Sequence, residues 1–131
     1  MKNFHLQKTH CTKKWLIGSE IHSGRGNLTK YHKAIRDKIP EIIKKDGFSC
    51  NVETMNDEEY LVEIEKKLSE EVTEYQNDKN SEELADILEV IYKIAKLKGI
   101  SKEQLEKIRL DKVEKRGAFE NNLFLVDTDE S

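Results

Sequence analysis

Proline placement leaves most of this chain free to form helices. Pro40 is the one proline among 131 residues, and proline inside a helix removes a backbone hydrogen bond and introduces a steric clash. Beyond it, apolar side chains recur three or four residues apart, at positions that include Tyr60, Ile64, Leu68 and Tyr75. This spacing places them on one face of a helix. The sequence therefore predicts a mainly α-helical fold.

Capping residues divide the pattern into four helices. Pro40 suits the first turn of the first helix, which we expect to end at Gly47. The expected caps of the other three are Asn56, Asn80 and Ser101, each followed three residues later by Glu or Gln. Residues 77–81 are expected to break the second helix from the third. Residues 48–54 alternate in polarity and residues 122–126 are mostly apolar, so we expect two short strands that pair in a small β element.

Two acidic pairs flank the expected break between the second and third helices. Glu71 and Glu74 precede it, while Glu83 and Asp86 follow it, so each pair shares one helix face. If the two helices pack antiparallel, the four carboxylates converge. They cannot all stay ionised in a partly buried place without a cation. The sequence therefore predicts a metal site, with these four side chains as ligands.

The competing interpretation of the acidic pairs is a solvated Glu/Lys face, because glutamate is common in this chain. The helical phase of Glu71 argues against it, since Glu71 lies three residues after Leu68 and faces the packed side. Oxygen ligands suit Mg²⁺, with Mn²⁺ as an alternative, and do not suit zinc. Because Mg²⁺ commonly bridges carboxylates to substrate phosphates, the site suggests a phosphorylated substrate.

Two basic groups are candidates for binding those phosphates. Arginine grips phosphate through a planar fork and lysine supplies a point charge. Each group also has a simpler interpretation, which is surface ion pairing for the first group and charge at a helix C-terminus for the second. The candidates are Lys33, Arg36 and Lys38 in the first group, and Lys112, Lys115 and Arg116 in the second.

Composition limits the other possibilities. A net charge of −3 gives no general reason to expect nucleic-acid binding. The two cysteines have no metal-type spacing and fit a reducing compartment, and there is no long apolar run, so we expect a cytoplasmic protein without a membrane segment. We expect one domain over residues 30–126 and a frayed tail at 127–131. Residues 1–29 are expected to be a disordered arm or a misassigned start. The codons for Arg25-Gly26 can form a ribosome-binding sequence, and Leu28 could then be encoded by a TTG start codon.

Taken together, these motifs resemble the MazG-like nucleoside triphosphate pyrophosphohydrolases. These enzymes belong to the superfamily of phosphoribosyl-ATP pyrophosphohydrolase and the dimeric dUTPases. Residues 33–43 are similar to the opening of a small MazG-like subgroup that reads Lys-Leu-Val-Arg-Asp-Lys-Ile-Pro, and residues 82–89 and 112–119 also fit. The similarity covers about residues 31–126. Ala34 and His32 depart from the leucine and asparagine usual in that opening, and the break between the acidic pairs is short.

The resemblance implies an all-α MazG-like bundle that works as a homodimer or higher homo-oligomer. It implies metal ligation by Glu71, Glu74, Glu83 and Asp86 and phosphate binding by Lys112 and Arg116. The implied reaction is Mg²⁺-dependent cleavage of a nucleoside triphosphate between its α and β phosphates, with Glu70 or Glu74 as the group that orients or deprotonates water. The alternatives are a phosphoribosyl-ATP pyrophosphohydrolase and a non-catalytic nucleotide-binding or helical interaction module. Base and sugar preference are not predicted.

Overall fold

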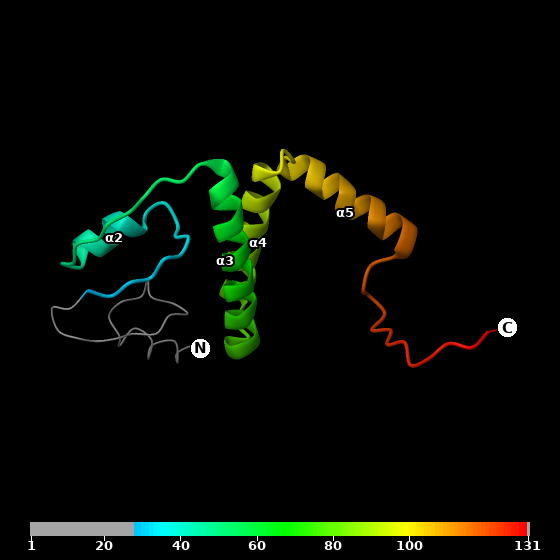
Figure 1. Cartoon of the computed structure of the whole chain (residues 1–131). Helices are drawn as coiled ribbons and strands as arrows, with labels where there is room; N and C mark the ends of the chain where they lie inside the picture. The colour runs from blue at the N-terminus through cyan, green and yellow to red at the C-terminus, as the bar shows by residue number, and fades with distance from the viewer. Residues whose placement is uncertain (1–27, 131) are drawn as a thin grey trace.

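The computed structural model describes residues 28–130, so the expected arm at 1–29 lies almost entirely outside the described residues. Within this range the chain is mainly helical (Figure 1). The helices, in chain order, are α2 at Ile39–Lys45, α3 at Asp57–Asp78, α4 at Ser81–Leu97 and α5 at Lys102–Arg116. The prediction of a mainly α-helical fold is therefore confirmed.

The predicted two-stranded β element is wrong. Neither residues 48–54 nor residues 122–126 form a strand, and no strand occurs anywhere in residues 28–130. The two segments lie on opposite sides of the hairpin formed by α3 and α4 (Figure 1), so neither can supply the other with backbone hydrogen bonds. An isolated alternating segment has no ladder partner and remains extended.

A helical hairpin of α3 and α4 forms the centre of the molecule. The Asn56 side chain accepts a hydrogen bond from the Glu59 backbone N–H at 2.8 Å and begins α3. The Asn80 side chain accepts hydrogen bonds from the backbone N–H groups of Glu82 and Glu83 and begins α4. Between them, Lys79 has φ of 58° and turns the chain. The connection is thus only two residues long, so the acidic residues on either side of it are held close together.

The buried core is small and lies along this hairpin. Ile64 of α3 and Val90 of α4 are buried together with Ala34, which comes from the N-terminal segment, residues 28–38. Partly buried neighbours that include Leu68 and Ile94 pack against them. Ala34 thus fastens the N-terminal segment to both helices of the hairpin, and this contact positions the charged residues on either side of Ala34.

The turn at residues 79–80, between α3 and α4, is hereafter called the acidic turn, and helix α5 begins at the opposite end of α4 from it. Ser101 and Gln104 form the predicted capping box, with hydrogen bonds of 2.8 and 3.1 Å. No residue of α5 is buried, and the helix points away from the hairpin (Figure 1). None of the four described helices combines the length and apolar character that crossing a bilayer requires.

Candidate metal centre

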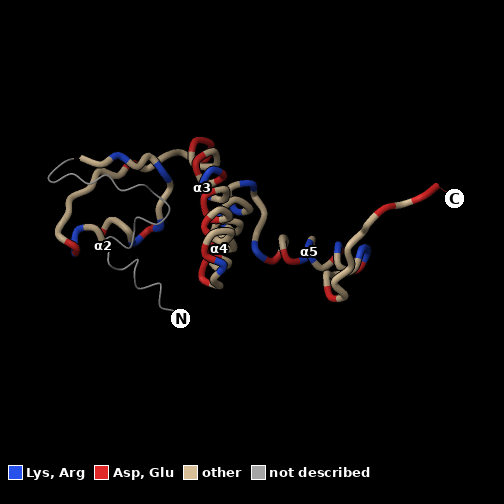
Figure 2. The backbone as a smooth tube through the Cα atoms, turned by 90° about the horizontal axis from the view of Figure 1, so that it is seen from below, with Lys and Arg blue, Asp and Glu red and all other residues tan. Residues whose placement is uncertain are grey.

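The two acidic pairs meet at the turn of the hairpin, as their spacing predicts. Glu71 is only 6% exposed and Glu83 only 7% exposed, although both are charged residue types. Figure 2 shows acidic residues, in red, along one side of the hairpin of α3 and α4. One carboxylate oxygen from each of Glu71, Glu83 and Asp86 lies within 4.8 Å of the other two. This is a set of hard oxygen donors of the kind that Mg²⁺ and Mn²⁺ prefer.

A second group of carboxylates shares Glu83 with the first. Oxygens of Glu74, Asp78 and Glu83 also lie within 4.8 Å of one another. The four predicted ligands are thus divided between two overlapping groups, with Glu83 in both. Asp78 did not emerge from the sequence, because residues 77–81 were expected to be a break. Asp78 lies four residues after Glu74, and this spacing could have indicated its role. Because α3 extends to Asp78, the two side chains share one helix face.

Hereafter, the acidic cluster denotes Glu71, Glu74, Asp78, Glu83 and Asp86. Burial, together with the negative charges of Asp86, Glu74, Glu71 and Asp78, raises the pKa of Glu83 to about 7, and burial is the largest of these causes. Burial also raises the pKa of Glu71, against the opposing effect of Lys67. Both carboxyl groups are therefore held in surroundings that disfavour their ionised form.

Two oxygen atoms of the cluster are buried without a hydrogen-bond partner among residues 28–130. They are Oε1 of Glu71 and Oε1 of Glu83, and a buried acceptor without a partner carries a desolvation cost of about 1–3 kcal/mol. A cation between the two helices would satisfy both atoms and would offset the repulsion among the carboxylates. The donor set and the two orphaned oxygens thus fit a divalent metal.

The N-terminal segment places cations against the acidic side of the hairpin. Lys33 Nζ donates to Glu70 Oε2 at 2.7 Å, and an Arg36 guanidinium nitrogen donates to Asp86 Oδ1 at 2.6 Å. These two contacts lie on either side of buried Ala34 and reach α3 and α4 respectively. Lys33 and Arg36, predicted as phosphate-binding residues, therefore lie beside the carboxylates, where their charge partly compensates that of the cluster.

Glu70 is enclosed by lysines. Besides its contact with Lys33, Glu70 forms an ion pair with Lys67. The Nζ atom of Lys67 lies 3.4 Å from Glu70 Oε1 and 3.4 Å from Glu71 Oε2. The side chains of Lys33, Lys67 and Glu70 are each about one-fifth exposed or less than that, at 18%, 16% and 21%. Lys67 did not emerge from the sequence, although its position four residues before Glu71 favours an ion pair within a helix. Glu70 is thus a charge-compensated carboxylate at the edge of the cluster.

The remaining predicted phosphate-binding residues lie elsewhere. Lys38 is exposed at the start of α2 and makes no side-chain capping bond. Lys112, Lys115 and Arg116 are exposed near the C-terminal end of α5. Because α4 has 17 residues and rises about 1.5 Å per residue, it separates the acidic turn from the start of α5 by roughly 25 Å. A single chain does not bring this second basic group to the cluster (Figure 1).

Comparison with known proteins adds one short similarity. No protein-family model matches the chain, and no solved structure matches it. An uncharacterized protein of Mycolicibacterium smegmatis is 42% identical to it over 40 residues, which is 30% of this chain and 41% of that relative. The chain therefore spans about two-fifths of the relative's length. The resemblance to MazG-like enzymes remains a prediction from the motifs.

Proposed function

We propose that this chain is a Mg²⁺-dependent nucleoside triphosphate pyrophosphohydrolase that releases a nucleoside monophosphate and pyrophosphate. The observation that carries the proposal is the pair of buried, orphaned carboxylate oxygens of Glu71 and Glu83 beside Asp86. Buried charges persist in proteins when they are paired or when they coordinate a metal. The resemblance to MazG-like enzymes likewise implies a site for a hard cation on a helical hairpin.

Glu71, Glu83 and Asp86 would hold the metal, and Glu74 and Asp78 would extend the cradle through the shared Glu83. When bound, a divalent metal polarises phosphoryl oxygens and lowers the pKa of bound water. The carboxylates must be ionised to act as ligands. The raised pKa of Glu83 therefore makes occupancy of the site depend on pH near neutrality.

Lys33 and Arg36 are the cations best placed to meet a triphosphate. In this structure they neutralise Glu70 and Asp86. Phosphate oxygens would replace those carboxylates as partners once Asp86 turned to the metal, and arginine would then hold the phosphate with its bidentate fork. A freed Glu70, or Glu74, would accept the proton of the attacking water.

Participation by Lys112, Lys115 and Arg116 would require a second copy of the chain. Within one chain, α5 directs them away from the acidic turn (Figure 1). A homodimer or higher homo-oligomer, which the resemblance implies, would allow the end of α5 from one copy to approach the cluster of its partner. The small core of the single chain supports the same proposal, because burying more apolar surface would stabilise it.

Pyrophosphate release from a panel of nucleotides in the presence of Mg²⁺ tests the proposed reaction. We expect release from at least one nucleoside triphosphate, with loss of activity in Glu71→Gln and in Asp86→Asn. The matched control is Glu89→Gln, which changes an exposed carboxylate on α4. Undiminished hydrolysis by both cluster variants would refute the metal assignment. Turnover of phosphoribosyl-ATP alone would assign that substrate instead, and nucleotide binding without turnover would indicate a non-catalytic module.

A further inference from the structure

An apolar segment at the C-terminal end of the chain lies open to solvent. Phe119 is almost completely exposed, and the run from Leu123 to Val126 consists of four consecutive large apolar residues. Each of these five side chains is at least 77% exposed. Single exposed apolar side chains are ordinary, but a contiguous group of this size marks an interaction surface. The C-terminal segment, residues 118–130, therefore lacks apolar cover from the residues that the structure describes.

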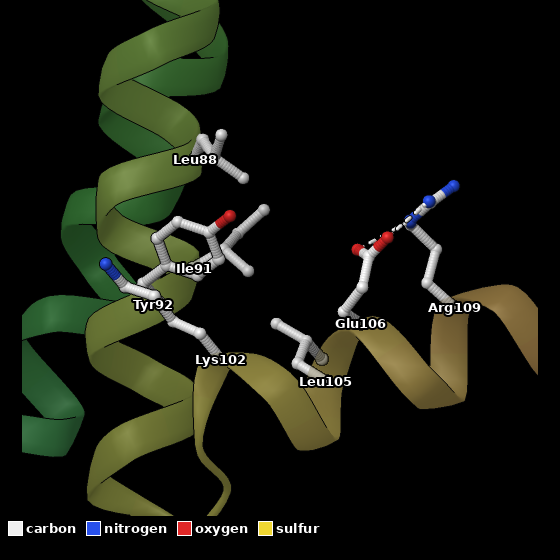
Figure 3. A pocket seen from close by; sticks show the side chains of 7 residues that line it. All are labelled: Leu88, Ile91, Tyr92, Lys102, Leu105, Glu106 and Arg109. Carbon is white, nitrogen blue, oxygen red and sulfur yellow. Dashed lines mark hydrogen bonds and ion pairs between the residues drawn. The ribbon is translucent and has the colours of Figure 1, made fainter.

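A hollow between α4 and α5 is a second apolar surface that is open to solvent. It has a volume of about 270 Å³ and is lined by Leu88 and Ile91 of α4 and Leu105 of α5 (Figure 3). This is smaller than the roughly 300–1,000 Å³ of typical small-molecule sites. The hollow lies against the middle of α4, from Leu88 to Tyr92, and the first turns of α5. Its size suits one or two apolar side chains of a docked peptide.

The rim of this hollow carries cations. Lys102 Nζ lies 4.7 Å from the centre of the Tyr92 ring. Arg109 lies on the next turns of α5, where it donates to both oxygens of Glu106 at 3.0 and 2.6 Å. Glu106 offsets the charge of Arg109, so Lys102 supplies the net positive charge beside the apolar wall. Peptides that present apolar side chains followed by acidic ones match such a surface.

The C-terminal segment has that order of residues. Its apolar run at 123–126 is followed directly by Asp127, and then by Asp129 and Glu130. An apolar anchor in the hollow would bring these carboxylates to the rim beside Lys102. Both the apolar surface and the sign of the charge are therefore complementary between the segment and the hollow.

We propose that the C-terminal segment of a second copy of this chain docks in the hollow between α4 and α5. In residues 28–130, the segment follows the far end of α5 and finally extends to the side away from α4 (Figure 1), while both surfaces stay exposed. Reciprocal exchange of the two segments covers both surfaces in both copies and closes with twofold symmetry. This assembly does not depend on the proposed hydrolysis, and separate experiments test the two proposals.

Zero-length carbodiimide cross-linking of the full chain identifies the occupant. An equal mixture of chains with natural and ¹⁵N isotopes is equilibrated and cross-linked, and the linked peptides are analysed by mass spectrometry. We expect links from Lys102 to Asp127, Asp129 or Glu130, with half of them joining a light peptide to a heavy one. Links only within chains of one isotope would show that the chain's own segment docks. That result, like the absence of Lys102 links, would overturn the proposal.

Sedimentation equilibrium measures the contribution of each surface. We expect Leu123→Ser combined with Phe124→Ser to raise the dimer dissociation constant about tenfold or more, because apolar anchors dominate such interfaces. Lys102→Glu should weaken association, and Lys107→Glu, which changes an exposed lysine of α5 outside the hollow, should have a smaller effect. A monomeric full chain would overturn the proposal, as would equal dissociation constants for the tail variant and the original chain.

Discussion

Replacing Glu83 by glutamine is expected to stabilise the metal-free chain at alkaline pH. The glutamine keeps the size of the side chain but removes a charge that is buried beside four other carboxylates. A carboxyl whose pKa is higher in the folded chain than in the unfolded one binds its proton more tightly when folded. Stability is therefore lost as the pH rises from 4.5, the ordinary pKa, through about 7, the pKa of Glu83 in the fold.

The size of this effect follows from the same two values. One pKa unit corresponds to about 1.4 kcal/mol, so the rise from 4.5 to about 7 destabilises the folded chain by about 3 kcal/mol once Glu83 is ionised. Below the ordinary pKa the group is protonated in both states, and the glutamine has almost no effect. The stability curves of the original chain and of Glu83→Gln should therefore converge at acidic pH and separate by about 3 kcal/mol near pH 8.

Urea denaturation in a chelating buffer, followed by circular dichroism across this pH range, measures the difference. Glu82→Gln is the matched control, because Glu82 also lies in the first turn of α4 beside the Asn80 cap but is exposed. Both substitutions lose the same favourable interaction with the helix dipole, so their difference isolates the burial of Glu83. Destabilisation by Glu83→Gln near pH 8, or an effect independent of pH, would show that the ionised Glu83 does not destabilise the fold.

Three further substitutions test other parts of the structure. Arg36→Gln should tighten Mg²⁺ binding up to about fivefold. The exposed ion pair Arg36–Asp86 competes with the metal for the carboxylate, and such a pair contributes about 0.2–1 kcal/mol. Calorimetric titration that showed weaker Mg²⁺ binding would contradict this prediction. Ile64→Ala should lower the free energy of unfolding by about 2–5 kcal/mol, because it removes a buried side chain from the small core. A loss as small as that of Val62→Ala, an exposed position on the same helix, would argue against that core. Asn80→Ala should cost about 1 kcal/mol and speed amide exchange at Glu82 and Glu83; unchanged exchange would show that the cap contributes nothing.

Local rules predicted the helices and the facing acidic pairs. Asn56, Asn80 and Ser101 cap helices through contacts two or three residues away, so a short stretch of sequence contains the whole signal. The inward phase of Glu71 follows from helical spacing alone, and the structure buries that residue. Features that depend only on neighbours in the same helix were thus readable from the sequence.

Features that depend on contacts between distant segments could not be predicted from the sequence. A strand at 48–54 needs a partner strand, and spacing within the segment cannot show that none is near. The ion pairs from Lys33 to Glu70 and from Arg36 to Asp86 span 37 and 50 residues, so the sequence identified the cations but not their partners. The direction of α5 depends on a short loop after Gly99, and this direction decides whether its basic end can reach the cluster.

Titration with Mn²⁺, followed by electron paramagnetic resonance, tests most directly whether the acidic cluster is a metal centre. We expect saturable binding near pH 8 that weakens as the pH falls through about 7, where Glu83 becomes protonated. Glu71→Gln and Glu83→Gln should each weaken binding by about tenfold or more, because loss even of a residue that only supports a metal ligand commonly has an effect of that size. Glu89→Gln should bind as the original chain does. Absence of saturable binding, or equal affinity in all three variants, would contradict the central claim.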